Sequence, residues 1–559
     1  MAKVVKKKKK SFASRGGGGA PHGGSGKKPQ HSIKLPGCMD TCPAGNQVRK
    51  FVTTLAQAEI LSKPMDQAYE EAWYVYAETN PFPAVLGRIC PHPCESNCNR
   101  KEHDGAVGIN KIERSIGDFG IEKKLKLKKI TDEKRPEKIA VVGAGPAGMS
   151  CAYQLARMGY PVTVFEAADK PGGMLLWGIP RYRLPEDVLM HEINNILELG
   201  VELKLNTAIG KDVPLTDLQG EYKAVFLSIG AHKGRKLGVE GEDAENVLSG
   251  VEFLNRIHHG ETVDVGNNVI VVGGGDTAID AARICRRLGS KTTIVYRRTI
   301  KEMPAIDEEI EEAQAEGIAL EYLVAPVGFT TENNHITHMN CIRMELGEPD
   351  SSGRRRPVPI EGSEFEIPAS TVIAAISQEP DFEGFENLIE GRDWFKVDDG
   401  GSVLKQENLF AGGDAVNLAL ATTAVGHGRV AATSIDLKLR GIEPPMPQKM
   451  PEVTTKRMRL DYYEKADRLE ADSLAVEQRL ADMFAEVNHS LTREQAVQEA
   501  KRCMSCGYCF YCEQCWIMCQ EQAIKKPANK GEPYEFELGK CNGCDKCMEV
   551  CPCGFIDMV

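Results

Sequence analysis

The spacing of hydrophobic and polar positions divides the chain into stretches of different character. Apolar residues recur with helical period over Gln47–Glu78 and again over Val107–Ile121, so a helix is predicted in each stretch. From Lys138 onward, short apolar runs alternate with helical patterns, which is typical of a parallel α/β sheet. Residues 452–489 are polar with helical periodicity and are interpreted as part of a linker. The next residues, Thr492-x-x-Gln495, have the spacing of a capping box that opens another helix.

The first strand of the α/β region, predicted over Lys138–Val142, runs into the turn Gly143-Ala-Gly145-Pro146-Ala147-Gly148. In such a turn the first glycine allows the tight bend, the second lets the backbone approach a pyrophosphate, and the third allows helix–strand packing. The following strand, Pro161–Phe165, ends at Glu166, whose carboxylate can bond a ribose hydroxyl. This combination predicts a dinucleotide site, and a purely structural turn is the alternative.

A second strand–turn–helix unit repeats this pattern with different chemistry at its end. Its strand, predicted to begin at Val269, leads into Gly273-Gly274-Gly275-Asp276-Thr277. The next strand, Thr292–Tyr296, ends in Arg297 and Arg298, where an NAD-binding unit would carry an acid. A guanidinium fork suits a 2′-phosphate, so NADP(H) is favoured over NAD(H). The alternative is that one arginine stacks on the adenine and the other is solvated.

Cysteine spacing adds a separate chemistry. The chain has 19 cysteines, and eleven of them lie between residues 503 and 553. Two runs with the C-x2-C-x2-C-x3-C spacing stand in tandem: Cys509, Cys512, Cys515 and Cys519, then Cys541, Cys544, Cys547 and Cys551. This is the spacing of a two-cluster ferredoxin, in which the fourth cysteine of each run ligates the other [4Fe-4S] cluster. Structural zinc on C-x2-C pairs is the alternative.

Length and charge narrow the class of protein. A chain of 559 residues is too long for one core, so three or four domains are expected. Its net charge of −11 argues against nucleic acid as the main partner. No stretch reaches the 18 or more apolar residues of a membrane span, so no membrane contact is expected. Clustered cysteines in a long chain indicate a metalloprotein of a reducing compartment, and a cytoplasmic location is expected.

Two dinucleotide sites beside iron–sulfur clusters imply a flavin, because a hydride carrier and one-electron centres need a converter between them. FAD is expected at the first site and the nicotinamide at the second. Hydride transfer between them needs stacked rings and exclusion of water, so no catalytic acid or base is predicted. The remaining cysteines, Cys151, Cys285, Cys341 and Cys553, are interpreted as small core residues.

Several motifs together resemble one family, the small (β) subunit of bacterial glutamate synthase and its relatives, over Cys38 to Leu439. They are GRICPHPCE (Gly87–Glu95), VGINKIER (Val107–Arg114), the first glycine-rich turn, PGGML (Pro171–Leu175), GIPRYRLP (Gly178–Pro185), VVGGGDTAID (Val271–Asp280), YRR (Tyr296–Arg298), AISQEPD (Ala375–Asp381) and FAGGDAV (Phe410–Val416). The resemblance implies FAD at the first site and NAD(P)H at the second. It also implies that Gly413 and Asp414 hold the FAD ribityl chain and that Gly172, Gly173 and Met174 lie beside the flavin.

The family also carries two N-terminal clusters, and here the chain departs from it. A C-x2-C pair is expected upstream of Cys38, where this chain has no cysteine. The segment with Cys503 and Cys506 looks like the missing pair, so these two are predicted to complete a cluster with Cys38 and Cys98, within one chain or across a homodimer. The resemblance implies a second set: Cys42, Cys90, Cys94 and Glu113. The alternative is that Cys503 and Cys506 are spare thiols beside the ferredoxin runs.

These observations predict an α/β protein with two nested Rossmann-type domains, a helical iron–sulfur domain and an α+β ferredoxin-like domain. The predicted divisions are a disordered basic tail at 1–33, an iron–sulfur domain at 34–134, an FAD domain at 135–258 and 372–448, an NAD(P)H domain at 259–371, a helical linker at 449–502 and a ferredoxin-like domain at 503–559. For the tail, a solvated segment is preferred over a tether for an acidic partner or a nucleic-acid contact.

The predicted function is that of an NAD(P)H:acceptor oxidoreductase subunit whose electrons pass to or from a separate redox protein. That partner is expected to be a ferredoxin or an enzyme like sulfite reductase or glutamate synthase, because the C-terminal extension resembles the iron–sulfur flavoprotein that partners the siroheme sulfite reductase of sulfur oxidisers. The alternatives are an electron-bifurcating transhydrogenase subunit and a non-catalytic electron-relay subunit. A zinc-bound interaction protein is a more distant alternative.

Overall fold

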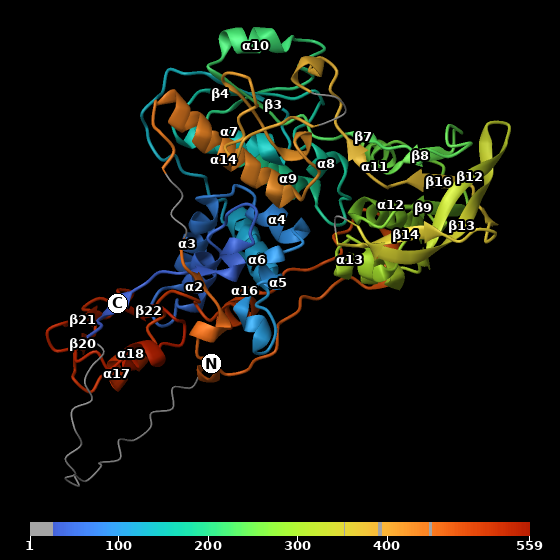
Figure 1. Ribbon diagram of the computed structural model, residues 1–559. Coiled ribbons are helices and arrows are strands. Elements are labelled where there is room, and N and C mark those ends of the chain that lie inside the picture. The colour runs from blue at the N-terminus through green and yellow to red at the C-terminus, as the bar shows by residue number, and fades with distance from the viewer. Residues whose placement is uncertain (1–25, 351–352, 390–393, 446–449) are drawn as a thin grey trace.

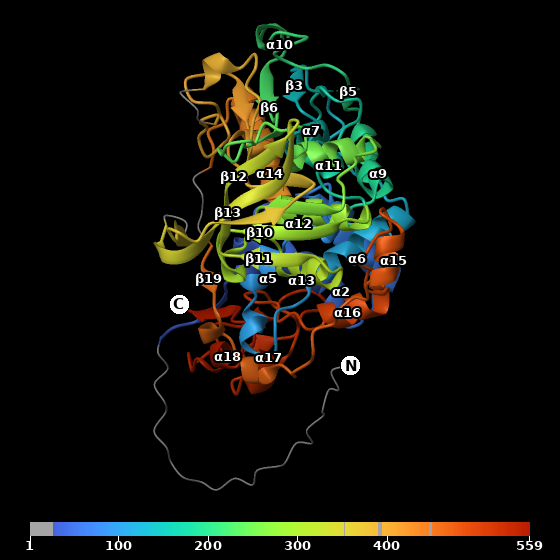
Figure 2. The same cartoon turned by 90° about the vertical axis from the view of Figure 1, so that its right-hand side faces the viewer.

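The computed structural model describes residues 26–350, 353–389, 394–445 and 450–559. One Rossmann-type sheet lies at one end of the molecule and the cysteine-rich C-terminal module at the other, with the N-terminal helices between them (Figure 1). The second Rossmann-type sheet lies to one side of this axis. The perpendicular view of Figure 2 shows the same separation of the two ends.

The N-terminal helices form the centre of the molecule. They are α1 (Gly37–Asp40), α2 (Val48–Ala56), α3 (Met65–Ala77), α4 (Pro83–Ile89), α5 (Pro93–Ser96) and α6 (Ile109–Glu122). The single helix predicted over Gln47–Glu78 is instead the pair α2 and α3. Ser62 adopts a left-handed φ of 56°, and Pro64 follows as the N-cap of α3. α2 has already ended at Ala56, and Pro64, which cannot donate the helical hydrogen bond, marks where α3 begins.

Helices α4 and α6 approach so closely that only glycine fits between them. A Cβ on Gly87 would lie 2.4 Å from the Cα of Arg114. This contact brings the end of α4, just before Cys90, next to Glu113 on α6. Close helix packing therefore joins two parts of one predicted cluster site.

The first Rossmann-type sheet is five-stranded and parallel, with the order β18-β6-β3-β4-β5. Its strands are β3 (Ile139–Val142), β4 (Val162–Phe165), β5 (Glu202–Lys204), β6 (Ala224–Leu227) and β18 (Leu409–Ala411). The associated helices are α7 (Pro146–Arg157), α8 (Met174–Trp177), α9 (Glu186–Leu197), α10 (Leu215–Glu221) and α14 (Ala421–Leu439). Strands β3, β4, β6 and β18 are buried throughout, as expected for a parallel sheet covered on both faces.

The second sheet is also parallel, with the order β11-β10-β9-β16-β8. Its strands are β8 (Val247–Ser249), β9 (Asn268–Val272), β10 (Lys291–Tyr296), β11 (Ala319–Tyr322) and β16 (Thr371–Ala374). Its helices are α11 (Gly250–His258), α12 (Asp276–Arg287) and α13 (Asp307–Ala315). An antiparallel sheet extends from it: β12 (Val324–Glu332), β13 (His335–Pro349), β14 (Arg355–Pro359) and β15 (Phe365–Pro368).

The boundaries predicted for the nested domain, 259 and 371, need correction. Strand β8 and helix α11 precede residue 259 but belong to the second sheet, and β16 continues beyond residue 371. The chain crosses between the domains at the antiparallel pair β7 (Lys233–Gly234) and β17 (Gln378–Glu379). The first unit of the nested domain has no glycine-rich turn, so its sequence carries no marker of the boundary.

The segment predicted as a helical linker is mostly irregular. It contains β19 (Glu452–Val453), the short helix α15 (Val476–Ala481) and α16 (Arg493–Ala500). Its polar groups bind other parts of the molecule: Arg468 pairs with Glu95 at 2.5 Å, and the N–H of Val487 donates to the carbonyl oxygen of Tyr182 at 2.9 Å. The capping box of α16 forms as predicted, with Thr492 and Gln495 bonding each other's backbone N–H.

The C-terminal module is small and includes a strand from the opposite end of the chain. Its elements are α17 (Gln514–Met518), β20 (Ile524–Lys525), β21 (Glu535–Phe536), α18 (Lys546–Glu549) and β22 (Ile556–Met558). Strand β1 (Pro29–His31) pairs antiparallel with β22, and β2 (Leu35–Pro36) pairs with β19. The predicted tail therefore ends earlier than residue 33, because β1 completes the edge of β22; residues 1–25 lie outside the described residues. Among the described residues, no helix has both the length and the apolar character to cross a membrane.

Candidate flavin, nicotinamide and iron–sulfur sites

The first glycine-rich turn has the geometry of a pyrophosphate site. Gly143 has a φ of 96°, and a Cβ on Gly148 would lie 1.9 Å from the carbonyl oxygen of Gly143. Gly145 is the N-cap of α7, which begins with Pro146 and Ala147. A Cβ on Gly173 would lie 2.9 Å from the Cα of Gly145. Two glycine backbones thus meet at a helix N-terminus, where peptide N–H groups favour an anion.

Two acids predicted at this site are held by the backbone. Glu166 follows β4, and its carboxylate accepts from the N–H groups of Ala144 at 2.7 Å and Ala168 at 2.9 Å. Asp414 accepts from the N–H of Ala419 at 3.2 Å, and burial raises its pKa to about 6. Both carboxylates therefore lie at ends of the first sheet, in fixed orientations.

The loops that carry the remaining predicted flavin contacts converge on the same turn. The N–H of Gly172 donates to the carbonyl oxygen of Ala144 at 3.0 Å, and Met174 begins α8. Gly413, with a φ of 67°, donates its N–H to Nδ1 of His427 on α14 at 3.1 Å. The sequence did not identify His427, because no motif marks a side chain that accepts a hydrogen bond from a separate loop.

The second glycine-rich turn lies at the end of β9. Gly273 has a φ of 152°, and a Cβ there would lie 2.2 Å from the carbonyl oxygen of Ala375. Gly274 faces the Tyr296 ring and Gly275 is the N-cap of α12. Asp276 accepts from the N–H of Ile306 at 3.0 Å, and Thr277 lies 3.4 Å from the amide of Gln378. These residues form a second nucleotide-type turn at a helix N-terminus.

The two predicted phosphate-binding arginines have different surroundings. Arg297, directly after β10, is exposed. Arg298 is only 5% exposed, and its guanidinium donates to Asp350 and to the carbonyl oxygen of Arg355, both at 2.8 Å. Arg297 is thus the residue available to a phosphate. Arg298 instead binds the chain before β14 and the start of β14 to the end of β10.

Fifteen of the 19 cysteines, together with Glu113, fall into four sets, which we name by their order from the first sheet. The proximal set is Cys42, Cys90, Cys94 and Glu113. The shared set is Cys38, Cys98, Cys503 and Cys506. The inner set is Cys509, Cys512, Cys515 and Cys551. The outer set is Cys519, Cys541, Cys544 and Cys547. Among the described residues, no three His, Cys, Asp or Glu side chains gather closely enough to hold a single metal ion.

The proximal set surrounds a buried carboxyl group. Glu113 is 6% exposed, and the hydroxyl of Tyr76 donates to it. Burial raises the pKa of Glu113 to about 8. After burial, the nearby Glu113 carboxyl is the next cause of the raised pKa of the Cys94 thiol, followed by Glu95 and Cys90. The Nδ1 of His92 lies 3.1 Å from the carbonyl oxygen of Cys90, and its Nε2 lies 3.8 Å from the carboxylates of Glu95 and Glu308.

The shared set forms within one chain. Its four cysteines line a single cavity together with the side chains of Arg49 and Arg100. Burial first, then the neighbouring thiols of Cys506, Cys503 and Cys98, raises the pKa of Cys38 well above its ordinary value. Two residues separated by more than 400 positions in sequence from Cys38 and Cys98 therefore meet them without a second chain.

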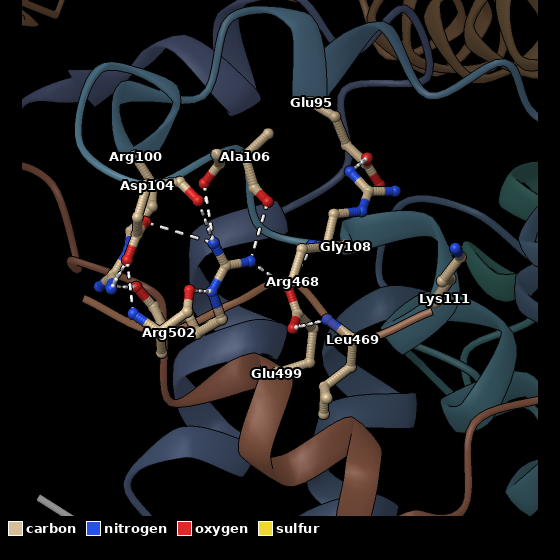
Figure 3. A network of polar contacts seen from close by, with 12 residues as sticks. Glu95, Arg100, Asp104, Ala106, Gly108, Lys111, Arg468, Leu469, Glu499 and Arg502 are labelled. Carbon is tan, nitrogen blue, oxygen red and sulfur yellow. Dashed lines mark hydrogen bonds and ion pairs between the residues drawn. The ribbon is translucent and has the colours of Figure 1, made fainter. Parts of the chain in front are cut away.

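A buried polar network holds the segment that carries Cys503 against the N-terminal helices (Figure 3). Glu499 is fully buried and accepts from the N–H groups of Gly108 at 2.7 Å and Leu469 at 2.9 Å. Arg502 pairs with Glu499 at 2.6 Å and donates to the carbonyl oxygen of Ala106 at 3.0 Å. Helix α16 is therefore attached directly to the loop before α6, which places Cys503 and Cys506 beside Cys98.

The inner set lines another cavity, in the C-terminal module. Two residues that were not predicted there line the same cavity: His31 of β1 and Cys553. The His31 ring stacks on Phe555 with centroids 4.9 Å apart, and the sulfur of Cys553 lies 3.8 Å from that of Cys551. Only the return of β1 to β22 could have identified His31, and the sequence of β1 carries no such signal.

The outer set includes an exposed member, Cys544. Burial raises the pKa of the Cys547 thiol, and the neighbouring thiols of Cys541 and Cys544 add to the rise, while a backbone hydrogen bond opposes it. Cys519 follows α17 and packs with Cys547 against the same small core.

The four sets follow one another along the molecule. Cys38 and Cys42, and likewise Cys94 and Cys98, are four residues apart, so the proximal and shared sets are separated by at most about 14 Å of backbone. Cys506 and Cys509 are three residues apart, which links the shared and inner sets over at most about 11 Å. The proximal set adjoins the first sheet, because Arg429 of α14 donates to the carbonyl oxygen of Ala44 at 3.0 Å.

Comparison with protein families identifies both main parts of the chain. Residues 137–428 match the family described as pyridine nucleotide-disulphide oxidoreductase. Residues 32–125 match the family described as dihydropyrimidine dehydrogenase domain II, 4Fe-4S cluster. The first match spans the two Rossmann-type sheets, and the second spans the N-terminal helices.

Three curated relatives extend over most of the chain. The beta subunit of NADPH-Fe(3+) oxidoreductase of Geobacter sulfurreducens is 36% identical over 84% of this chain and 75% of its own length. The beta subunit of NADP(+)-dependent formate dehydrogenase of Moorella thermoacetica is 39% identical over 72% of this chain and 60% of its own length. The small chain of NADPH glutamate synthase of Escherichia coli is 35% identical over 72% of this chain and 88% of its own length. Each of these relatives is named as a subunit or chain of a larger enzyme.

These matches confirm the resemblance to glutamate synthase small subunits. They also confirm the predicted fold, in which a helical iron–sulfur domain precedes two nested dinucleotide domains in the sequence. The chain is therefore an oxidoreductase of the pyridine nucleotide-disulphide oxidoreductase family, in the branch that joins this fold to an N-terminal 4Fe-4S domain.

Proposed function

We propose that this protein is an NADPH:acceptor oxidoreductase subunit that exchanges electrons with a separate redox protein through its C-terminal module. The observation that carries the proposal is the unbroken series of four cysteine sets from α14 to the exposed Cys544. A series of this kind joins a nucleotide-binding end to a surface, which is the arrangement an electron-transfer subunit requires.

The residues at each end fit the groups they would hold. The backbones of Gly145 and Gly173 form a cradle for the FAD pyrophosphate, and Glu166 and Asp414 present carboxylates to its ribose and ribityl hydroxyls. Gly273–Thr277 and the exposed Arg297 would hold NADPH. When bound, FAD accepts hydride from NADPH, and the clusters carry single electrons. The protein contributes orientation and exclusion of water.

The same reasoning assigns ligands to the four cysteine sets. Thiolates are the usual ligands of [4Fe-4S] clusters, and the inner and outer sets exchange their fourth cysteines as two-cluster ferredoxins do. We assign Glu113 as the fourth ligand of the proximal set, because it is the buried carboxyl beside three thiols. We assign the shared set as a cluster site within one chain, which requires no homodimer.

The physiological partner is proposed by chemical class only: a protein with a one-electron centre that can approach the outer set. The names of the relatives support this class, because they describe single subunits or chains of larger enzymes that use NADPH or NADP(+). A sulfite-reductase-like or glutamate-synthase-like partner is compatible with it.

The direct test is anaerobic reduction of the purified protein. NADPH should bleach the bound flavin, and turnover should continue with an artificial one-electron dye as acceptor. The variant Cys544→Ser should keep NADPH-dependent bleaching but reduce a protein acceptor such as a ferredoxin poorly. A flavin that neither NADPH nor NADH reduces would instead support a relay subunit with structural nucleotide sites.

A further inference from the structure

Arg49, near the start of α2, occupies an unusual position between two cysteine sets. Its Nη1 donates to the carbonyl oxygen of Cys506 at 2.6 Å and to that of Lys34 at 2.7 Å. Its guanidinium also lies over the Tyr508 ring, 5.3 Å from the ring centroid. The side chain lines the cavity of the shared set, and the inner set begins at Cys509, one residue beyond Tyr508.

The charge of Arg49 lacks a carboxylate partner in the part of the chain that the structure describes. The second arginine of the same cavity, Arg100, differs in this respect, because Asp104 binds its Nε at 2.6 Å. Arg49 is partly buried, and withdrawing a guanidinium from water against carbonyl oxygens alone is costly unless an anion lies nearby. The groups that interact electrostatically with Arg49 are the thiols of Cys38, Cys503, Cys506 and Cys553.

We propose that Arg49 is a positioning residue that raises the reduction potential of the shared-set cluster, by placing one uncompensated positive charge between that cluster and the inner set. The inference rests on the proposed function, since it requires a cluster at the shared set. Adding an electron makes such a centre more negative, so a fixed cation beside it stabilises the reduced form. Charge and hydrogen bonding around the ligands are established determinants of cluster potential.

The charges around the proximal set are mixed. Glu113 and Glu95 both act on Cys94, and the guanidinium of Arg429 on α14 interacts with Cys42. Glu95 also acts on Cys98 of the shared set. The effect of Arg49 is therefore local to the shared set and the adjoining inner set, because its charge has no carboxylate partner among the described residues.

The experiment is a redox titration of the anaerobic holoprotein followed by electron paramagnetic resonance. The shared-set signal is identified as the one that Cys503→Ser/Cys506→Ser removes. Arg49→Gln should shift its midpoint to more negative potential by at least a tenfold change in the oxidised-to-reduced ratio, which is 59 mV for one electron. Arg49→Lys keeps the charge, so its midpoint potential should stay close to that of the wild type. Lys50→Gln removes the same charge from the next residue, whose side chain is 55% exposed, and should leave the midpoint unchanged.

Three results would overturn the inference. An unchanged midpoint in Arg49→Gln with full iron content would show that the charge does not set the potential. An equal shift in Lys50→Gln would show a non-specific effect of net charge. If the wild-type protein has no signal that depends on Cys503 and Cys506, the shared-set assignment itself fails, and iron analysis distinguishes this case. If Arg49→Gln does not retain its iron, Arg49→Met fills the same space beside Tyr508 without charge and is titrated instead.

Discussion

At the scale of single residues, adjacent side chains of the same type have different roles. Arg297 and Arg298 follow the same strand, yet one is exposed and the other is buried against Asp350. Alternation along the extended chain explains the difference, because successive side chains point to opposite faces. The sequence identified the pair, but only the fold separates a phosphate-binding role from a structural one.

We expect Arg297→Gln to lower kcat/KM for NADPH about 10- to 100-fold and to leave NADH almost unaffected, because a charged hydrogen bond contributes about 1.5–3 kcal/mol. Steady-state kinetics with both nucleotides and a dye acceptor measures the ratio. Arg298→Gln is the matched control, and it should lower the melting temperature without changing the preference. A change of preference in Arg298→Gln instead would reverse the two assignments.

Glu192 gives a prediction for pH. Burial raises its pKa from 4.5 to about 8, although it accepts from the N–H groups of Ala84 at 2.7 Å and Val85 at 3.0 Å. The folded state therefore holds a proton that the unfolded state releases between these values. The stability contributed by this proton is complete below about pH 4.5 and is lost as the pH rises toward 8, by at most about 1.4 kcal/mol per pH unit.

Glu192→Gln keeps the shape of the side chain and removes this titration. Melting temperatures measured anaerobically from pH 5 to pH 8 should fall more steeply for the wild type than for Glu192→Gln. Parallel curves would contradict the raised pKa.

At the scale of elements, α16 connects distant parts of the chain. Glu499 satisfies two backbone N–H groups from separate segments, and its pairing with Arg502 fixes the loop of Cys503 (Figure 3). Removing one member of a buried ion pair costs about 3–5 kcal/mol, because the other charge stays buried. The helix therefore positions half of the shared set.

We expect Glu499→Gln to lose about four irons per chain, the content of one cubane cluster, by disconnecting the Cys503 segment from the N-terminal helices. Glu494→Gln is the matched control, because Glu494 lies on the same helix but is exposed. Iron and sulfide analysis after anaerobic purification measures the difference. Equal iron content in both variants would mean that the network does not hold the cluster site.

Local patterns predicted those elements whose signals are contained in a short window. The capping box at Thr492, the strands before Gly143 and Gly273, and the pairing of the C-terminal cysteines into two runs are of this kind. The return of β1 to β22 and the position of Arg49 depend on contacts between distant segments. The meeting of Cys38 with Cys503 was predicted only because a family pattern had a gap at one place and a matching segment at another.

At the scale of the whole molecule, the arrangement is directional. The first Rossmann-type sheet lies at one end with the second to one side, the N-terminal helices hold the first two cysteine sets, and the C-terminal module carries the last two (Figures 1 and 2). Two crossings of the chain stabilise this order, since β1 joins the C-terminal module and α16 joins the N-terminal helices. We propose that these two contacts complete a fourth cluster site inside one chain.

The most direct measurement is anaerobic quantification of iron, sulfide and FAD per chain, in the wild type and in Cys503→Ser/Cys506→Ser. Four cubane sites predict about sixteen irons and one FAD in the wild type, and about twelve irons in the double variant. The same iron content in both proteins, or about twelve irons in the wild type, would contradict the account and leave Cys38, Cys98, Cys503 and Cys506 as structural thiols.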